Sequence, residues 1–475
     1  MTYYNGYEMV IGLEVHVELA TASKMFCSCS TAFGAAPNTQ CCPVCMGLPG
    51  ALPVTNRRAV ELAVLAGRAL DCHVKTYSAW DRKNYFYPDN PKAYQITQYR
   101  HPICLDGAVE IETSEGVKSI GITRIHLEED AGKLTHDEQK GTMIDFNRCG
   151  VPLIEIVSEP DLRSPEEAVA YLKKLRTYLR FAGVSDCLMQ EGSMRCDVNL
   201  SVRPVGQAAL GERTELKNIN SFAFVAKAID YEYRHQVDLI LQGKEIYPQT
   251  RRFDPDTGKT HLMRRKESNA EYRYFSEGDL PPVVLSREQI ARIAATLPVL
   301  PDERCARYVG AWGLAKKEAE HIASHRALSD YFEAAASTTA YPVIAANLLL
   351  SEFLRFVPDE EFSCPVAPEH LGELATLQGE ETVNSATVKK LIKRLFAGDF
   401  SPREAVECEG LAQINDRELL AAWVREVLES DPASVEALRG GKSNAMGALV
   451  GAVMAKSAGR ANPRLVNSLI EELLQ

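Results

Sequence analysis

The stretch VIGLEVHVEL, at residues 10–19, has the clearest strand pattern in the chain. Leucine or valine occupies every second position from residue 13 to residue 19, and Glu14, His16 and Glu18 lie between them. Alternate side chains of a strand point to opposite faces of a sheet. The stretch therefore predicts a strand with one face in a core and with a carboxylate, an imidazole and a second carboxylate on the other.

Short strands continue to about residue 283, and two helical patterns interrupt them. One helix is predicted from the cap Ser164, followed by Pro165, to Gly183, and another ends at Gly243. Strands separated by turns and a few helices are typical of an antiparallel sheet in the α+β class. Further strands are predicted at residues 107–113, 117–130, 152–162 and 195–204.

The pattern changes to helices from about residue 284. Ser286 with Gln289 three residues later forms a capping-box sequence, and helical periodicity then dominates through residue 400. Prolines within residues 279–303 mark one boundary, and a second falls near residues 400–408. We therefore predict three domains, at residues 1–292, 293–405 and 406–475.

Composition places the chain among ordinary globular proteins, with 45% apolar and 25% charged residues. The net charge of −11 argues against a protein that coats polyanions through its overall charge. No apolar run approaches the ~20 residues of a membrane helix, and we recognise no secretory signal, so we expect a cytoplasmic location. Residues 442–470 lack acidic residues and offer either a local polyanion contact or a solvated helix surface. Their cations are Lys442, Lys456, Arg460 and Arg464.

Four cysteines have the spacing of a zinc site. Cys27 and Cys29 are followed by twelve residues and then by Cys42 and Cys45. Two close pairs of thiolates can supply four tetrahedral ligands to zinc. The first pair is more closely spaced than usual, so buried thiols without metal are the alternative. A site with four thiolates is full, and we expect the metal to be structural.

Carboxylates gather in several of the same segments. Glu128 and Glu129 precede Asp130 at the end of an alternating strand, and Glu215 lies between two cations. Consecutive strand residues face opposite ways, so the first three can converge only if the strand bends or ends there. Such carboxylates near Glu14 suit either a divalent cation or a set of surface ion pairs.

Cations and aromatic residues accompany these carboxylates. Residues 80–99 combine Arg82, Lys83 and Lys92 with six aromatic side chains, and Arg195 begins another strand. Carboxylates that hold Mg²⁺ beside Arg and Lys are what phosphoryl transfer needs. The chain has no G-x-x-x-x-G-K-[ST] motif, which argues against a P-loop mechanism.

These segments together resemble the B subunit of the bacterial tRNA-dependent amidotransferase, in the aspartyl/glutamyl-tRNA(Asn/Gln) amidotransferase family. The resemblance runs from about residue 7 to the end of the chain, in the family's order. It rests on IGLEVHVEL (11–19), DRKNYFYPDNPKAYQITQY (81–99), HLEEDAGK (126–133), VPLIEIVSEPDLRSPEEA (151–168), EGSMRCDVN (191–199), TELKNINSF (214–222) and SNAMGALVGAVMAKSAGRANP (443–463).

The resemblance implies an ATP-dependent carbon–nitrogen ligase with glutamine as amido donor. Such a protein phosphorylates the side-chain carboxylate of Glu or Asp misacylated on tRNA(Gln) or tRNA(Asn). Ammonia from an amidase-family glutaminase, the A subunit, then displaces the phosphate, and a small C subunit completes the assembly. The implied fold is a cradle of antiparallel sheet similar to glutamine synthetase, then a helical domain and a small helical tail that reaches tRNA.

The resemblance also implies residue roles. Mg²⁺ is expected in the cradle together with ATP, and Zn²⁺ at the four cysteines that only some members have. Lys83 and Arg195 are expected to contact phosphate. The expected magnesium residues are Glu14, His16, Glu128, Glu129 and Glu215.

Two other functions are compatible with parts of the sequence. One is an ATP-dependent ligase for a free amino acid, which the tail module argues against. The other is a zinc-bearing scaffold that docks tRNA without a phosphoryl-transfer site of its own. The related archaeal E subunit is disfavoured because it carries an inserted domain that 475 residues do not accommodate.

Overall fold

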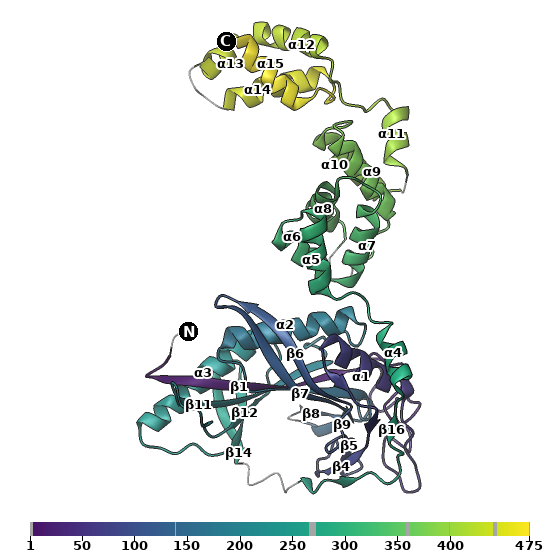
Figure 1. Ribbon diagram of the computed structural model, residues 1–475, viewed down its shortest axis with the longest axis vertical. Helices are drawn as coiled ribbons and strands as arrows, with labels where there is room; N and C mark the ends of the chain where they lie inside the picture. Colours follow the sequence, from purple (N-terminus) through teal and green to yellow (C-terminus); the bar gives the residue numbers. More distant parts are fainter. Residues whose placement is uncertain are drawn as a thin grey trace. The chain divides into compact units, whose positions relative to one another are not determined.

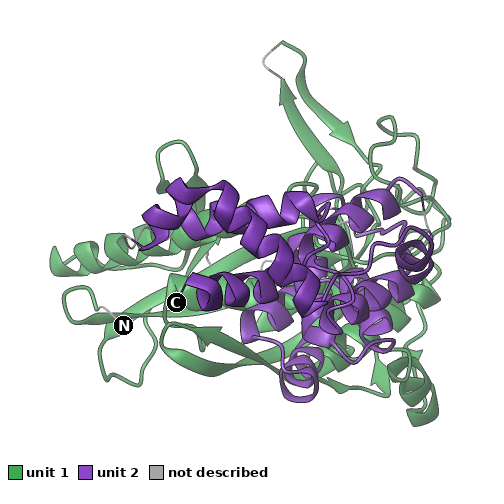
Figure 2. Cartoon of the chain, turned by 90° about the horizontal axis from the view of Figure 1, so that it is seen from above, with its two compact units in different colours: residues 1–300 green, residues 301–475 purple. Residues whose placement is uncertain are grey.

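The structure is a computed structural model, and it describes residues 3–137, 139–265, 272–357, 362–398, 400–439 and 444–474. The chain divides into two compact units, residues 1–300 and residues 301–475 (Figure 2). Unit 1 contains the sheets and unit 2 is helical, in agreement with the predicted sheet domain followed by helical parts. The division into three domains stays a prediction.

The stretch at residues 10–19 forms most of β1, near the middle of a nine-stranded sheet. The strand order is β14-β13-β12-β11-β1-β10-β7-β6-β2. All pairs are antiparallel except β12 with β13. The strands are β1 (Tyr7–Glu18), β2 (His73–Val74), β6 (Cys104–Thr113), β7 (Gly116–Glu129), β10 (Pro152–Ser158), β11 (Met194–Pro204), β12 (Thr214–Lys217), β13 (Gln249–Asp254) and β14 (Lys259–Arg265).

Three helices pack against one face of this sheet, and a fourth, α4 (Arg287–Ala294), packs against α1. The three are α1 (Arg57–Ala69), α2 (Pro165–Phe181) and α3 (Phe222–Leu241). Ser164 and Ser221 cap α2 and α3 through their side chains, and the Ser286 capping box opens α4. The helix starts predicted at Ser164 and Ser286 are therefore confirmed.

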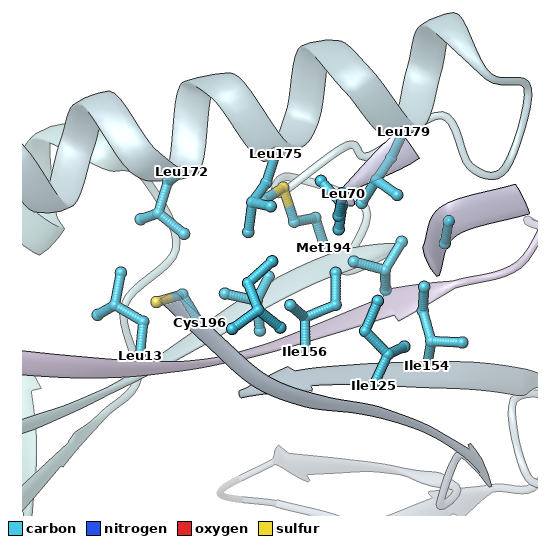
Figure 3. Close-up of a cluster of buried hydrophobic side chains, with 14 of the residues drawn as sticks. Leu13, Leu70, Ile125, Ile154, Ile156, Leu172, Leu175, Leu179, Met194 and Cys196 are labelled. Carbon is cyan, nitrogen blue, oxygen red and sulfur yellow. The ribbon is translucent and has the colours of Figure 1, made fainter. Parts of the chain in front are cut away.

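The core of unit 1 lies between these helices and the apolar face of the sheet. Leu13 of β1 and Ile156 of β10 face Leu172 and Leu175 of α2 (Figure 3), and all four are at most 1% exposed. Burying one such side chain contributes roughly 1.5–3 kcal/mol. This packing holds β1 in place, so its alternate residues must point to the opposite face.

Three small sheets complete unit 1. Figure 1 draws β4, β5, β8 and β9 on the side of the large sheet away from α2. The first small sheet contains β15 (Phe275–Ser276), β4 (Asp81–Asn84) and β5 (Tyr94–Thr97). The second contains β16 (Val283–Val284) and β3 (Tyr77–Ser78), and the third contains β8 (Lys133–Asp137) and β9 (Gly141–Asp145).

Unit 2 has two hydrophobic clusters, one formed by residues 308–406 and one by residues 420–470. Lys442, one of the basic residues of the tail, lies outside the described residues. No helix in the described ranges is both long and apolar enough to cross a membrane. The elements are α5 (Pro301–Trp312), α6 (Lys316–Ala323), α7 (Arg326–Ala336), α8 (Pro342–Ser351), η2 (Phe353–Arg355), α9 (Pro368–Gly379), α10 (Ser385–Leu395), α11 (Pro402–Cys408), α12 (Arg417–Ser430), α13 (Pro432–Arg439), α14 (Asn444–Lys456) and α15 (Pro463–Leu474).

Candidate active site

A row of polar side chains crosses the sheet on the face opposite the helices. His16 of β1 is paired in register with Glu155 of β10 and Arg195 of β11, and Glu155 is paired with His126 of β7. Directly opposite residues on antiparallel strands project from the same face. Four strands thus place two imidazoles, a carboxylate and a guanidinium side by side.

His16, Glu128 and Glu155 form the first cluster, which we call the histidine–carboxylate cluster. The His16 Nε2 atom lies 3.2 Å from Glu128 Oε1 and 3.5 Å from Glu155 Oε2. His126 Nε2 lies 3.1 Å from Glu155 Oε2 on the other side. One ligand atom from each of the three cluster residues lies within 4.8 Å of the others, which suits a single metal ion.

Burial alone would lower the pKa of His16. The neighbouring carboxylates of Glu155 and Glu128 outweigh that effect and raise the pKa to about 10. For Glu128, burial acts to raise the pKa, but hydrogen bonds with His126 and His16 hold it well below its usual range. Without a cation, the cluster therefore balances its negative charge with protonated imidazole.

Glu14, Asp197 and Glu215 form the second cluster, which we call the three-carboxylate cluster. One oxygen of each lies within 4.8 Å of the others. Lys217 Nζ lies 2.5 Å from Asp197 and 3.2 Å from Glu215. Glu14 and His16 share a face of β1, yet they belong to different clusters because β11 and β12 flank one side of β1 and β10 the other.

The three-carboxylate cluster has the chemistry of a magnesium site. Its donors are all oxygen atoms, which Mg²⁺ prefers. Asn199 donates its amide to Glu14 Oε1 at 2.9 Å, and its own carbonyl oxygen is buried with no hydrogen-bond partner among the described residues. A buried carbonyl oxygen that lacks a hydrogen-bond donor, next to three carboxylates, fits a bound cation.

Lys83 of β4 faces the histidine–carboxylate cluster from the small sheet. Burial alone would lower its pKa, but the charges of Glu128, Tyr274 and Glu155 raise it above the usual value. The ammonium group therefore stays protonated near neutral pH and carries a positive charge next to the cluster.

Arg195 lies at the other side of this cluster and is held by an acidic residue. Its Nη2 atom donates to Asp130 Oδ2 at 2.7 Å, and Arg148 Nε lies 3.4 Å from the same oxygen. Arg148 also donates to the backbone carbonyls of Ala131 and Gly132. These contacts fix the direction of the Arg195 guanidinium.

The structure does not bring Glu129 to either cluster. Strand β7 pairs in regular register with β10 from Arg124 through Glu129, so Glu128 and Glu129 point to opposite faces. The Glu129 carboxylate is paired with Lys92 Nζ, and it accepts a hydrogen bond from the Ile96 amide at 3.0 Å. Glu128 and Glu129 could converge only if the strand bent between them, and the strand is regular at that point.

The four predicted cysteines, Cys27, Cys29, Cys42 and Cys45, do lie together, with their sulfurs within 4.8 Å of one another. Lys24, which is only 1% exposed, directs its Nζ atom at Cys45 Sγ at 3.6 Å. A hydrogen bond from Cys27 lowers the pKa of Cys45 to about 4, and Lys24 adds to this shift. A thiolate set with a buried lysine beside it fits a tetrahedral zinc ion, whose four thiolates carry excess negative charge.

Sequence reasoning missed the roles of Glu155 and His126. Glu155 is the only charged residue in the apolar run VPLIEIV, at residues 151–157. A carboxylate within a buried strand needs a partner, and this was the available signal. Asp197 lies in the segment EGSMRCDVN at residues 191–199, but the alternation of its strand does not show which carboxylates it joins.

A nine-stranded sheet with helices on one face and two clusters of possible metal ligands on the other is an arrangement that suits a catalytic domain. Residues 9–291 match the family described as the GatB/GatE catalytic domain, and residues 330–474 match the GatB domain. The chain belongs to the family formed by the B subunits of aspartyl/glutamyl-tRNA(Asn/Gln) amidotransferases.

Relatives that carry this name cover almost the whole chain. The protein from Caldanaerobacter subterraneus subsp. tengcongensis is 50% identical over 471 residues, which are 98% of this chain and 99% of the relative. The protein from Caldicellulosiruptor saccharolyticus is 48% identical over 476 residues, with 99% of both chains covered. The protein from Thermodesulfovibrio yellowstonii is 48% identical over 472 residues, again with 99% of each.

Proposed function

We propose that this chain uses ATP to phosphorylate the side-chain carboxylate of Glu on tRNA(Gln), of Asp on tRNA(Asn), or of both. A carboxylate oxygen attacks the γ-phosphorus of ATP, and ADP leaves. Ammonia then attacks the carbonyl carbon of the acyl phosphate, phosphate leaves, and loss of a proton gives the amide. The names of the relatives support the tRNA substrate and the amide product.

One observation carries this proposal: strand β1 contributes Glu14 and His16 to two separate metal-competent clusters on one face. Residues two apart on a strand lie roughly 7 Å apart along the chain. Two adjacent clusters can therefore face one polyphosphate together with the carboxylate that attacks it. Mg²⁺ bound by these residues would neutralise charge on the phosphoryl oxygens.

The protein's own cations act beside these clusters. Lys83 stays protonated and can contact a phosphoryl oxygen, while Arg195 is oriented by Asp130 to do the same. Both groups offer fixed positive charge before the reaction starts, so little reorganisation is needed when charge develops. Glu128 and Glu155 keep Lys83 charged, and they hold His16 in place.

The remaining assignments follow the family. We infer that Cys27, Cys29, Cys42 and Cys45 hold a structural Zn²⁺ ion and that the sheet unit forms a cradle similar to glutamine synthetase. Residues 293–405 are proposed as a helical domain and residues 406–475 as a tail that contacts tRNA. A glutaminase of the amidase family, the A subunit, supplies ammonia, and a small C subunit completes a cytoplasmic heterotrimer.

The test compares ATP hydrolysis by the reconstituted complex with and without misacylated tRNA. Wild-type protein is expected to hydrolyse ATP faster with the tRNA, and equal rates would contradict the tRNA-dependent reaction. Glu128→Gln and Glu14→Gln are expected to lose phosphorylation while tRNA binding is retained. Glu110→Gln, at an exposed position of β6, is the matched control. Full phosphorylation by both site variants would favour the tRNA-docking scaffold.

A further inference from the structure

Tyr272 and Tyr274 lie near Lys83, which faces the histidine–carboxylate cluster. Tyr99 stacks on Tyr274, and Phe86 is linked to the same segment through Arg273. We call Phe86, Tyr99, Tyr272 and Tyr274 the aromatic platform. The rings of Tyr99 and Tyr274 are stacked, with centroids 4.1 Å apart and an angle of 9° between their planes. The Tyr272 ring meets Tyr274 edge-on at 6.0 Å. Rings from segments far apart in the sequence therefore lie in contact.

Strand β4 holds part of this platform in place. The Asn84 side chain donates to the carbonyl oxygens of Tyr272 at 3.1 Å and of Arg273 at 2.8 Å. Two residues further on, Phe275 of β15 is paired in register with Arg82 of β4. The segment that carries Tyr272 and Tyr274 is thus tied to the strand that carries Lys83.

Phe86 and Tyr99 are the exposed rings of the platform, and each has a cation beside it. Phe86 is 73% exposed and Tyr99 is 42% exposed, so apolar ring surface faces the solvent. The guanidinium of Arg273 lies 5.7 Å from the Phe86 centroid, and that of Arg124 lies 5.7 Å from the Tyr99 centroid. Aromatic faces combined with positive charge are the usual means of binding single-stranded nucleic acid.

Lys83 connects the platform to the reaction centre. Its Nζ atom lies 5.1 Å from the Tyr272 centroid, and its charge is stabilised by Glu128 and Glu155 of the histidine–carboxylate cluster. The amino acid of an aminoacyl-tRNA is esterified to the 3′-terminal ribose. The terminal base must therefore lie within about one nucleotide of the carboxylate that reacts, which is where the platform is.

We propose that the aromatic platform binds the unpaired 3′ end of the aminoacyl-tRNA by stacking on its terminal bases. This inference rests on the proposed function, because it takes the reacting carboxylate to be attached to tRNA. The cations place the backbone phosphates, and the rings accept the bases through their faces. The stacking also explains why apolar surface stays exposed beside a strongly charged site.

The experiment compares binding of intact tRNA with binding of tRNA that lacks its 3′-terminal nucleotide, using the full chain in its complex. In the wild type, removal of the nucleotide is expected to weaken binding roughly tenfold, since stacking of one base on an aromatic side chain has an effect of this order. Phe86→Ala and Tyr99→Leu are expected to reduce this ratio to about one, while Tyr99→Phe keeps it.

Phe33→Ala is the matched control because Phe33 is 75% exposed, lies in the cysteine loop and is no part of the platform. An unchanged ratio in Phe86→Ala and Tyr99→Leu would overturn the proposal. A weaker affinity for a non-hydrolysable ATP analogue with an unchanged ratio would overturn it too, by assigning the rings to the adenine of ATP. Because the ratio is measured without turnover, it is independent of whether Glu128→Gln abolishes phosphorylation.

Discussion

Replacing Lys92 by methionine is expected to destabilise unit 1 by about 3–5 kcal/mol, the usual cost of breaking a buried ion pair. The side chains of Lys92 and Glu129 are only 9% and 5% exposed, and the change leaves the Glu129 carboxylate with its hydrogen bond from Ile96 but without its cation. Coulomb's law gives a similar value, about 4 kcal/mol, for charges ~4 Å apart at an effective dielectric constant of about 20.

A double-mutant cycle separates the pair from other effects. Glu129→Gln alone leaves Lys92 buried and unpaired, so it is expected to destabilise unit 1 as well. The double variant Lys92→Met/Glu129→Gln removes both charges and is expected to recover most of the lost stability. The coupling energy from the cycle then measures the ion pair itself.

Urea denaturation followed by tryptophan fluorescence is the assay. The chain has 3 tryptophans, and Trp80, which is 2% exposed, is the one in unit 1. Replacing Trp312 and Trp423 by phenylalanine in all variants makes the signal report on unit 1. A coupling energy below about 1 kcal/mol, as for a solvated surface pair, would refute the reasoning and would leave Glu129 available as a metal ligand.

Three further predictions concern the metal-binding residues. Glu155→Gln is expected to weaken binding of Mn²⁺, a spectroscopic substitute for Mg²⁺, at least tenfold in an electron paramagnetic resonance titration; unchanged binding would remove Glu155 from the site. Burial would lower the pKa of His16, but Glu155 and Glu128 raise it to about 10 in the metal-free protein. His16 must therefore lose a proton before it can bind a metal ion. Mn²⁺ affinity at this cluster is therefore expected to rise with pH between about 6.5 and 8.5, and a flat profile would argue against a role for His16. Cys45→Ser is expected to eliminate bound zinc, measured by mass spectrometry of the purified chain, and to destabilise unit 1, whereas the exposed Cys408→Ser keeps the metal; equal zinc contents would contradict the four-thiolate site.

Several features of the site follow from short stretches of the sequence. The alternation at residues 10–19 predicted that Glu14 and His16 share a polar face, and the structure places them on one. Spacing predicted that four cysteines lie together, because two short pairs can fold back on each other within a single loop. The caps at Ser164 and Ser286 predicted where helices begin, since capping depends on residues three positions apart. Each of these conclusions needs only neighbouring residues.

The tertiary structure decided which residues act together. Glu14 and His16 join different clusters because β11 lies on one side of β1 and β10 on the other, and neither strand is near β1 in the sequence. Glu155 reaches His16 across more than a hundred residues of chain. Glu129 points away because β7 stays in regular register with β10 at Glu128 and Glu129. Side-chain direction follows from the local period of a strand, whereas strand order follows from burial of the whole apolar face. The sequence by itself therefore determined the faces, and only the folded sheet determined the partners.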